Sequence, residues 1–311
     1  MDGRRILVIA GPTAVGKTEY AIEAAKAFNG EIVSCDSMQL YQYMDIGSAK
    51  PNEEERRQAI HHLIDFLDPR EDFSVARYQQ MARETIDDIL RRGKLPVISG
   101  GTGLYLNSIL YDMDFAEAAG NEELRESLKA KADSEGPEAL HAMLAEMDPA
   151  AAERIHPNNI KKVIRAIERM QAGEGEVRPF DGNISENPAY DPLMVCLTRD
   201  RAELYDRINR RVDLLIEAGL VDEVRSLTEM GLTAEDISMK GIGYKEIIEY
   251  LDGKVSLEEA IDNIKKNTRH YAKRQLTWFR RYDKMNTVNL SAYLNEEEAK
   301  GEFIRWLEKK L

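Results

Sequence analysis

Short apolar runs alternate with helical patterns in the first hundred residues. The runs Ile6–Ala10, Glu31–Cys35 and Leu95–Ser99 each end at glycine or polar residues, and their length is typical of buried strands. Between them, Lys17–Phe28 and Val75–Arg92 carry apolar residues at helical spacing. Strands that alternate with helices predict a parallel sheet with helices on both faces.

The pattern changes after residue 112. Residues 113–150 are acidic, rich in alanine and helical, Asn158–Gln171 forms an amphipathic helical pattern, and residues 173–192 are rich in Gly, Pro and Asn and predict a loop. Leu193–Leu197 returns to a strand. From Arg201 onward we expect only helices, over Tyr205–Leu215, Leu220–Met230, Lys245–Leu251, Leu257–Phe279 and Glu296–Leu311.

A phosphate-binding loop follows the first strand. Residues 11–18 match G-x-x-x-x-G-K-[ST], with a strand before the loop and a helix after it. Such a loop turns N–H groups toward a di- or triphosphate, ATP included, and the helix N-terminus adds a favourable dipole. The motif comprises Gly11, Pro12, Thr13, Ala14, Val15, Gly16, Lys17 and Thr18. We therefore expect an α/β fold with a P-loop NTPase-like core (residues 1–112 and 191–311), a helical insertion (113–190) and a helical C-terminal part.

Asp36 is the first candidate for chemistry beside this loop. It follows the second strand, at the sheet edge where ligands of α/β proteins bind, and a carboxylate there can accept a proton from a nucleophile. The alternative is a helix N-cap or an Asx turn. The strand at 95–99 ends in Gly-Gly-Thr-Gly, without the acid that ATPases use for magnesium, and Asp65 is a weak substitute. This pattern favours a transferase over an ATP-driven machine.

Net charge and charge distribution point in different directions. The chain of 311 residues carries a net charge of −13, which argues weakly against nucleic acid. Basic residues nevertheless gather at 154–169 and at 264–284, where Arg269, Lys273 and Arg280 share one helix face. That face is either a phosphate footprint or a solvated surface. No apolar run is long enough to span a membrane, and the two cysteines suit buried thiols, so we expect a cytoplasmic protein.

Several longer motifs run in order from residue 11 to residue 280. They are G-P-T-A-V-G-K-T at 11–18, D-S-M-Q-L-Y-Q-Y-M-D-I-G-S-A-K-P at 36–51, H-H-L-I-D-F-L-D-P at 61–69, G-G-T-G-L-Y at 100–105, D-P-A-A-A-E-R-I-H-P-N-N at 148–159, R-I-N-R-R-V at 207–212, G-I-G-Y-K-E at 241–246 and T-R-H-Y-A-K-R-Q-L-T-W-F-R at 268–280. Together they resemble the bacterial tRNA dimethylallyltransferases.

The resemblance implies a reaction and a donor site. The family moves a prenyl group from dimethylallyl diphosphate to N6 of adenosine 37 in tRNAs that read codons beginning with U, and diphosphate leaves. By this resemblance, Lys17, Thr18 and Arg211 hold the diphosphate, Thr18 also binds Mg²⁺, and Asp36 takes the N6 proton.

The resemblance also implies a tRNA surface and a flipped target base. The implied contacts are Asp36, Ser37, Met38, Gln39, Thr102, Arg125, Ile160, Lys161, Lys162, Val163 and Ile164, to which the basic pattern adds Arg269, Lys273 and Arg280. An ion pair within its helix is the alternative for Arg125. We expect a monomer, because this recognition needs no symmetry partner.

Three other functions stay open at this point. A P-loop nucleotide or small-molecule kinase would share the loop and an acid after the second strand. An adenylate isopentenyltransferase would use the same donor but free AMP, ADP or ATP as the acceptor. A non-catalytic RNA-binding module would have no use for Asp36 beside an intact phosphate loop. The long insertion and the basic stretches favour tRNA.

Overall fold

The computed structural model describes residues 4–113, 122–171 and 185–311. The chain divides into two compact units. The core unit comprises Met1–Leu110 and Asn187–Leu311, and the insertion unit comprises Tyr111–Glu186.

A six-stranded parallel sheet forms the centre of the core unit. Its order is β3-β2-β4-β1-β5-β6, and every neighbouring pair is parallel. In register, Leu7 of the central strand lies between Val97 and Leu193. The arrangement confirms the predicted α/β fold. The strands are β1 (Arg5–Ala10), β2 (Gly30–Ser34), β3 (His61–His62), β4 (Leu95–Gly100), β5 (Asp191–Thr198) and β6 (Asn286–Asn289).

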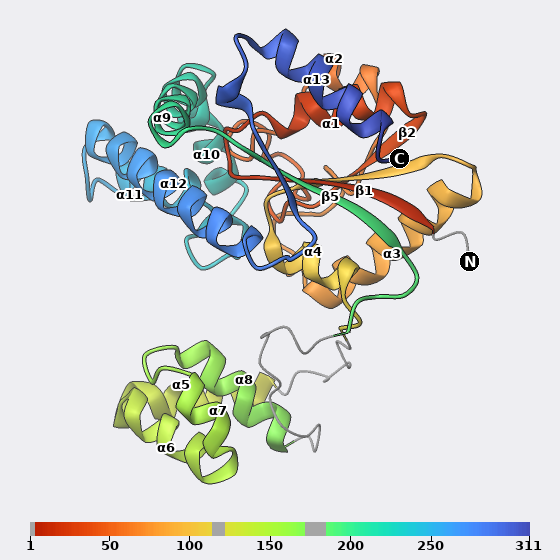
Figure 1. Cartoon of the computed structure of the whole chain (residues 1–311). Helices are drawn as coiled ribbons and strands as arrows, with labels where there is room; N and C mark the ends of the chain where they lie inside the picture. Colours follow the sequence, from red (N-terminus) through yellow and green to blue (C-terminus); the bar gives the residue numbers. More distant parts are fainter. Residues whose placement is uncertain (1–3, 114–121, 172–184) are drawn as a thin grey trace. The chain divides into compact units, whose positions relative to one another are not determined.

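Helices cover both faces of this sheet. Figure 1 shows α1 (Lys17–Ala27) and α13 (Glu296–Glu308) over one face, with α3 (Val75–Arg91) and α4 (Gly103–Leu110) on the other. Alternate residues of β1 serve the two layers, because successive side chains of a strand point to opposite faces. Leu7 and Ile9 join the α1 and α13 core, and Ile6 and Val8 are equally buried.

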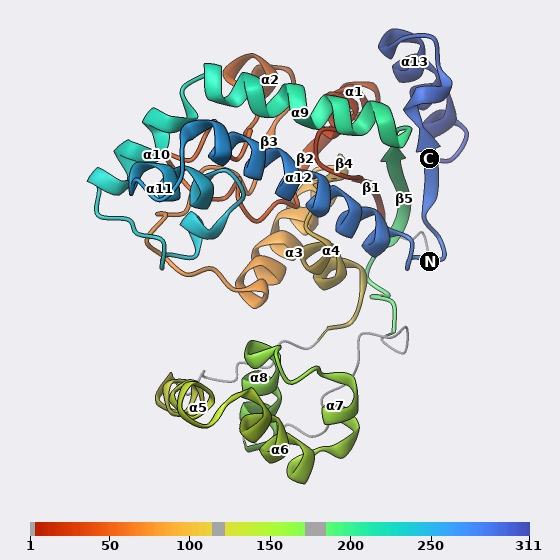
Figure 2. The ribbon, with the colours of Figure 1, turned by 90° about the vertical axis from the view of Figure 1, so that its left-hand side faces the viewer.

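The other helices of the core unit gather beyond the carboxyl end of the sheet. In Figure 2, α9 and α12 run side by side. These helices are α9 (Arg201–Glu217), α10 (Leu220–Glu229), α11 (Tyr244–Leu251) and α12 (Leu257–Phe279), while α2 (Glu53–Gln58) precedes β3 and short 3₁₀ turns occupy Ser238–Lys240 and Leu290–Ala292. No helix in the described ranges is both long and apolar enough to cross a membrane.

The expectation that only helices follow Arg201 is wrong, because β6 lies at Asn286–Asn289. This strand holds a single apolar residue, Val288, so its sequence carries no strand pattern. Its pairing with β5, in which Val195 lies opposite Asn286, makes it the edge strand. The short β3 is absent from the sequence expectation for the same reason.

The insertion unit is helical in the part that the structure describes. Its helices are α5 (Glu122–Glu135), α6 (Pro137–Met147), α7 (Pro149–Arg154) and α8 (Ile160–Gln171). They enclose an apolar core that includes Leu128, Leu140, Leu144, Val163 and Ile167. The loop expected at 173–192 lies outside the described residues up to 184.

Candidate functional site

The phosphate loop lies between β1 and α1, as its sequence motif requires. Gly16 adopts φ = 112°, a left-handed conformation that favours glycine, and α1 begins directly after it. Among the described residues, the N–H groups from Gly16 to Thr18 make no hydrogen bond, and as the first N–H groups of a helix they can face an anion. The side chain of Val15, by contrast, is directed away from a ligand, since it lies in the core.

Basic side chains donate hydrogen bonds to the backbone carbonyl groups of this loop. Lys17 Nζ donates to the carbonyl oxygens of Gly11 and Pro12 at 3.0 and 2.9 Å. Arg207 of α9 donates to the Ala14 carbonyl at 3.0 Å. Arg199, in the turn before α9, donates to the Val15 carbonyl at 3.1 Å. Burial lowers the pKa of Lys17 to about 8, and the charge of Asp36 opposes that shift.

A glutamine of α12 joins the phosphate loop to the glycine-rich turn after β4. Gln275 Oε1 accepts a hydrogen bond from the Thr13 N–H at 2.9 Å, and Gln275 Nε2 donates to the Gly101 carbonyl at 3.0 Å. A Cβ at Gly101 would lie 2.2 Å from Gln275 Nε2, so no larger residue fits there without displacing the amide. The Thr13 N–H is therefore engaged by protein and does not point freely at a ligand.

Asp36 lies where β2 ends, and a threonine from the β4 turn holds the residues around it. Its Oδ1 accepts from the Met38 N–H at 2.9 Å, which is the Asx-type bond, and its Oδ2 has no hydrogen bond to the described part of the chain. The Thr102 N–H donates to the Cys35 carbonyl at 3.1 Å, and Thr102 Oγ1 accepts from the Ser37 N–H at 3.1 Å. Asp36 therefore forms the Asx turn through Oδ1, while Oδ2 makes no hydrogen bond to the described residues.

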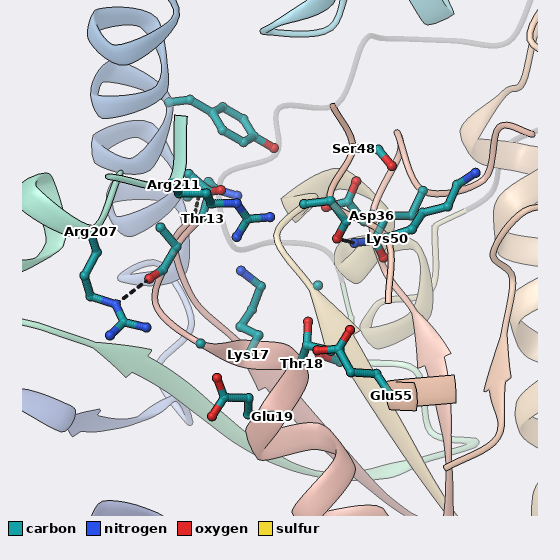
Figure 3. Close-up of a pocket in the computed structure, with 18 of the residues that line it drawn as sticks. Thr13, Lys17, Thr18, Glu19, Asp36, Ser48, Lys50, Glu55, Arg207 and Arg211 are labelled. Atoms are coloured by element: carbon teal, nitrogen blue, oxygen red, sulfur yellow. Dashed lines mark hydrogen bonds between the residues drawn. The ribbon is translucent and has the colours of Figure 1, made fainter. Parts of the chain in front are cut away.

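These elements surround a cavity of about 560 Å³ at the carboxyl end of the sheet. Figure 3 shows Lys17, Asp36 and Arg211 reaching into it from α1, the loop after β2 and α9. Burial lowers the pKa of the Arg211 guanidinium, and the Asp36 carboxylate acts in the opposite direction. The charged side chains that line the cavity are Lys17, Lys50, Arg207, Arg210 and Arg211 against Glu19, Asp36 and Glu55. This excess of positive charge suits a polyanionic ligand.

The donor set of the cavity suits a magnesium ion that a substrate helps to bind. No cluster of three metal-binding side chains occurs within the described residues. Thr18 and Glu55 both line the cavity, and in Figure 3 the Glu55 carboxylate points toward the Thr18 hydroxyl. Mg²⁺ prefers oxygen ligands and is often held by one or two protein groups together with phosphate oxygens. Asp65, the substitute considered from sequence, instead pairs with Lys50 at 2.8 Å.

The other residues of the loop after β2 have separate tasks. Gln39 lines the cavity, accepts from Ser34 Oγ at 3.2 Å and donates to the Ala49 carbonyl at 3.2 Å. Met38 packs on the backbone near Gly241, where a Cβ would lie 2.6 Å from its methyl group. Ser37 stays partly exposed beside Thr102.

The cavity also includes residues that were not identified from the sequence as site residues. Among them are Lys50, Arg207, Tyr271 and Gln275. Arg207 begins the R-I-N-R-R-V motif and the last two lie in the motif at 268–280, so those motifs were the available signal. Lys50 lies in the motif at 36–51, and its side chain is 2% exposed through its pairs with Asp45 and Asp65.

The three basic residues predicted to share one helix face, Arg269, Lys273 and Arg280, do not all share one environment. Arg269 is partly buried and donates to Asn209 of α9 at 2.6 Å, so it links α12 to α9. Lys273 and Arg280 are exposed and line a second cavity of about 670 Å³ at the end of β5, together with Arg201. A phosphate-binding role for this pair stays a prediction.

The insertion unit buries two of the side chains expected to touch tRNA and gives Arg125 a partner within the unit. Arg125 Nε donates to Glu168 at 2.9 Å, and Glu168 is only 4% exposed, so Arg125 joins α5 to α8. Val163 and Ile164 lie in the apolar core of the unit, which removes their side chains from any RNA surface. Their helix does expose Lys161 and Lys162, while Ile160 packs partly against the core.

Comparison with known proteins gives the ancestry of this arrangement. The family model described as IPP transferase matches residues 39–282. The chain belongs to the IPP transferase family. A further model, described as isopentenyl transferase, matches residues 4–66, which include the phosphate loop and Asp36.

Curated relatives of the chain share nearly its full length, which confirms the resemblance seen in the motifs. It is 55% identical to a tRNA dimethylallyltransferase of Alkaliphilus oremlandii over 93% of each chain, and 48% identical to that of Clostridioides difficile over 97% of each. The crystal structure of a tRNA isopentenylpyrophosphate transferase from Bacillus halodurans is similar with a TM-score of 0.74, at 44% identity over 99% and 96% of the two chains. The structure of a eukaryotic dimethylallyltransferase acting on tRNA is similar with a TM-score of 0.75, at 31% identity over 88% of this chain and 69% of the other.

Proposed function

We propose that this protein transfers the dimethylallyl group of dimethylallyl diphosphate to N6 of an adenosine in tRNA and releases diphosphate. The observation that carries the proposal is the meeting of Asp36, Lys17 and Arg211 in one cavity above an intact phosphate loop. Relatives up to 55% identical are named tRNA dimethylallyltransferases and support it. We propose adenosine 37 as the target, in tRNAs that read codons beginning with U.

The donor half of the reaction depends on the leaving group. The bond between the allylic carbon and the diphosphate oxygen breaks, and both electrons leave with the diphosphate. Lys17, Arg211 and the N–H groups at the start of α1 are placed to take up that charge. Thr18, with Glu55 nearby, would hold Mg²⁺, which supplies further neutralisation of the phosphate oxygens.

The acceptor half depends on Asp36. As the adenine N6 attacks the allylic carbon, it must lose a proton, and Oδ2 of Asp36 is free among the described residues to receive it. The other oxygen is held by the Met38 N–H, which fixes the direction of the carboxylate. A base stacked within an anticodon loop cannot reach a buried carbon, so the adenosine has to be flipped out. We propose that the enzyme works as a monomer in the cytoplasm, where its tRNA substrate is found.

A transfer assay tests the proposal. Purified protein, Mg²⁺ and radiolabelled dimethylallyl diphosphate are incubated with unmodified tRNA and, in parallel, with AMP, ADP and ATP. We expect label only in tRNA, at an adenosine of the anticodon loop. Label in the free nucleotides would instead identify an adenylate isopentenyltransferase. No label anywhere, with ATP consumed, would identify a kinase.

A further inference from the structure

The loop from Asp36 to Lys50 forms one wall of the cavity, yet its middle lies away from it. Asp36 and Gln39 line the cavity at one end of the loop, and Ser48, Ala49 and Lys50 line it at the other. The first end is fastened by Thr102 and by β2. The second end begins within a tight turn at residues 44–49, which lies outside any helix or strand.

A carboxylate of α10 binds the backbone of that turn. Glu223 Oε2 accepts from the N–H groups of Asp45 and Ile46 at 2.8 and 2.7 Å, and Oε1 accepts from the N–H of Gly47 at 3.0 Å. Glu223 Oε1 also accepts from the Tyr244 hydroxyl of α11 at 2.9 Å. Three successive N–H groups thus converge on one side chain that comes from 176 to 178 positions further along the chain.

Only an ionised carboxylate suits all four donors. A carboxylate offers acceptors on both oxygens, whereas a glutamine would direct an NH₂ group toward two of the donors. Burial and the Glu223 carboxylate hold the pKa of Tyr244 well above its ordinary value, so its hydroxyl remains a donor. The Tyr244 ring also fills the space beside Gly47, where a Cβ would lie 2.5 Å from it.

The clamped turn leads directly to the buried cation of the cavity wall. Lys50 Nζ reaches Asp45 at 2.7 Å, the residue whose N–H is held by Glu223. Ala49, one residue earlier, carries φ = 48°, an uncommon conformation for a residue other than glycine, and its carbonyl accepts from Gln39. A shift of the turn would therefore move Lys50 and Gln39 together.

We propose that Glu223 is a positioning residue, which sets the acceptor-side wall of the cavity by clamping the backbone N–H groups of residues 45–47. The inference rests on the proposed function, because it assigns this wall to the adenosine rather than to the diphosphate. The charge of Lys50 in this wall is already paired with Asp45 and Asp65. The donor is bound by the phosphate loop, which Glu223 does not contact. Loss of the clamp should therefore affect the two substrates differently: the use of the acceptor falls, while donor binding is retained.

The test compares Glu223→Gln with Glu229→Gln, an exposed glutamate at the end of the same helix. Amide hydrogen exchange is measured by mass spectrometry on the full chain, together with kcat/KM for tRNA and the Kd of diphosphate. For Glu223→Gln we expect faster exchange at residues 44–50, unchanged exchange at 11–18, kcat/KM for tRNA lowered by roughly ten- to a hundredfold, and an unchanged Kd. Glu229→Gln should match the wild type in every measurement.

A second variant keeps the test decisive if Glu223→Gln folds poorly. Tyr244→Phe retains the ring against Gly47 and removes one donor from Glu223, so it should give the same pattern to a smaller extent. Unchanged exchange at 44–50 would overturn the proposal, as would an equal loss of tRNA use and diphosphate binding. If the wild-type protein fails to modify tRNA at all, the proposed function falls and this role for Glu223 falls with it, whereas exchange still reports whether the clamp exists.

Discussion

Gln275 and Thr13 lie 262 residues apart in the chain and are joined by a hydrogen bond of 2.9 Å. The same carboxamide also binds Gly101, so one side chain of α12 sets the distance between the phosphate loop and the turn that carries Thr102. Thr102 in turn holds the backbone beside Asp36. A single helix thereby fixes the phosphate loop relative to the backbone beside Asp36.

Replacement of Asp36 by asparagine should remove the base and keep the turn. The amide oxygen can still accept from the Met38 N–H, so the loop geometry is preserved. We expect turnover to fall by about 10²–10⁴-fold, measured as single-turnover prenyl transfer at saturating substrates. Binding of tRNA in a filter assay should be unchanged. Normal turnover would remove Asp36 as the proton acceptor.

The lowered pKa of Lys17, about 8, predicts a pH dependence of diphosphate binding. The ammonium form is the one that binds the anion, and it predominates below the pKa. Affinity should therefore be constant at lower pH and weaken above pH 8, by about tenfold per pH unit once the amine is neutral. Calorimetry in two buffers of different ionisation enthalpy should show proton uptake on binding above pH 8.

Lys17→Arg is the matched variant for that experiment. Arginine stays protonated throughout the range, so the decline above pH 8 should disappear even if its different shape weakens binding. A decline that persists in this variant would assign the titration to another group.

Lys273 and Arg280 are expected to bind tRNA phosphates through the second cavity. In the double variant Lys273→Gln/Arg280→Gln, the slope of log K against log salt should become shallower by about 2, because two fewer counterions are released. Lys309→Gln/Lys310→Gln at the exposed end of the chain provides the control of equal charge change. An unaltered slope would make the Lys273 and Arg280 face a solvated surface.

Arg125 is expected to stabilise the insertion unit rather than to bind RNA. Arg125→Gln removes the bond from α5 to the buried carboxylate of Glu168, which also pairs with Arg165, and should cost about 1–3 kcal/mol in urea unfolding. In the double variant with Glu168→Gln, the loss should be smaller than the sum of the two single losses. Weaker tRNA binding with unchanged stability would restore Arg125 to the RNA surface.

The local pattern of the chain predicted most elements of the core unit. Five-residue apolar runs and the Gly-Lys-Thr signature place β1, α1, β2, α3 and β4 within a residue or two of their observed bounds, and α12 was predicted over its observed span. These features depend on neighbours in sequence, since apolar periodicity and helix ends are local properties. The edge strands β3 and β6 carry too few apolar residues for such a signal.

Tertiary structure decided which residues share the cavity. The sequence by itself determined the family, the phosphate loop and Asp36 as the acid beside it, because each depends on short motifs of contiguous residues. It could not place Gln275 against Thr13, Glu223 under the turn at 45–47, or Arg125 on Glu168, because those partners meet only when separate helices pack. The amphipathic pattern at 158–171 did separate Val163 from Lys162, and the structure confirms that Val163 is buried while Lys162 is exposed.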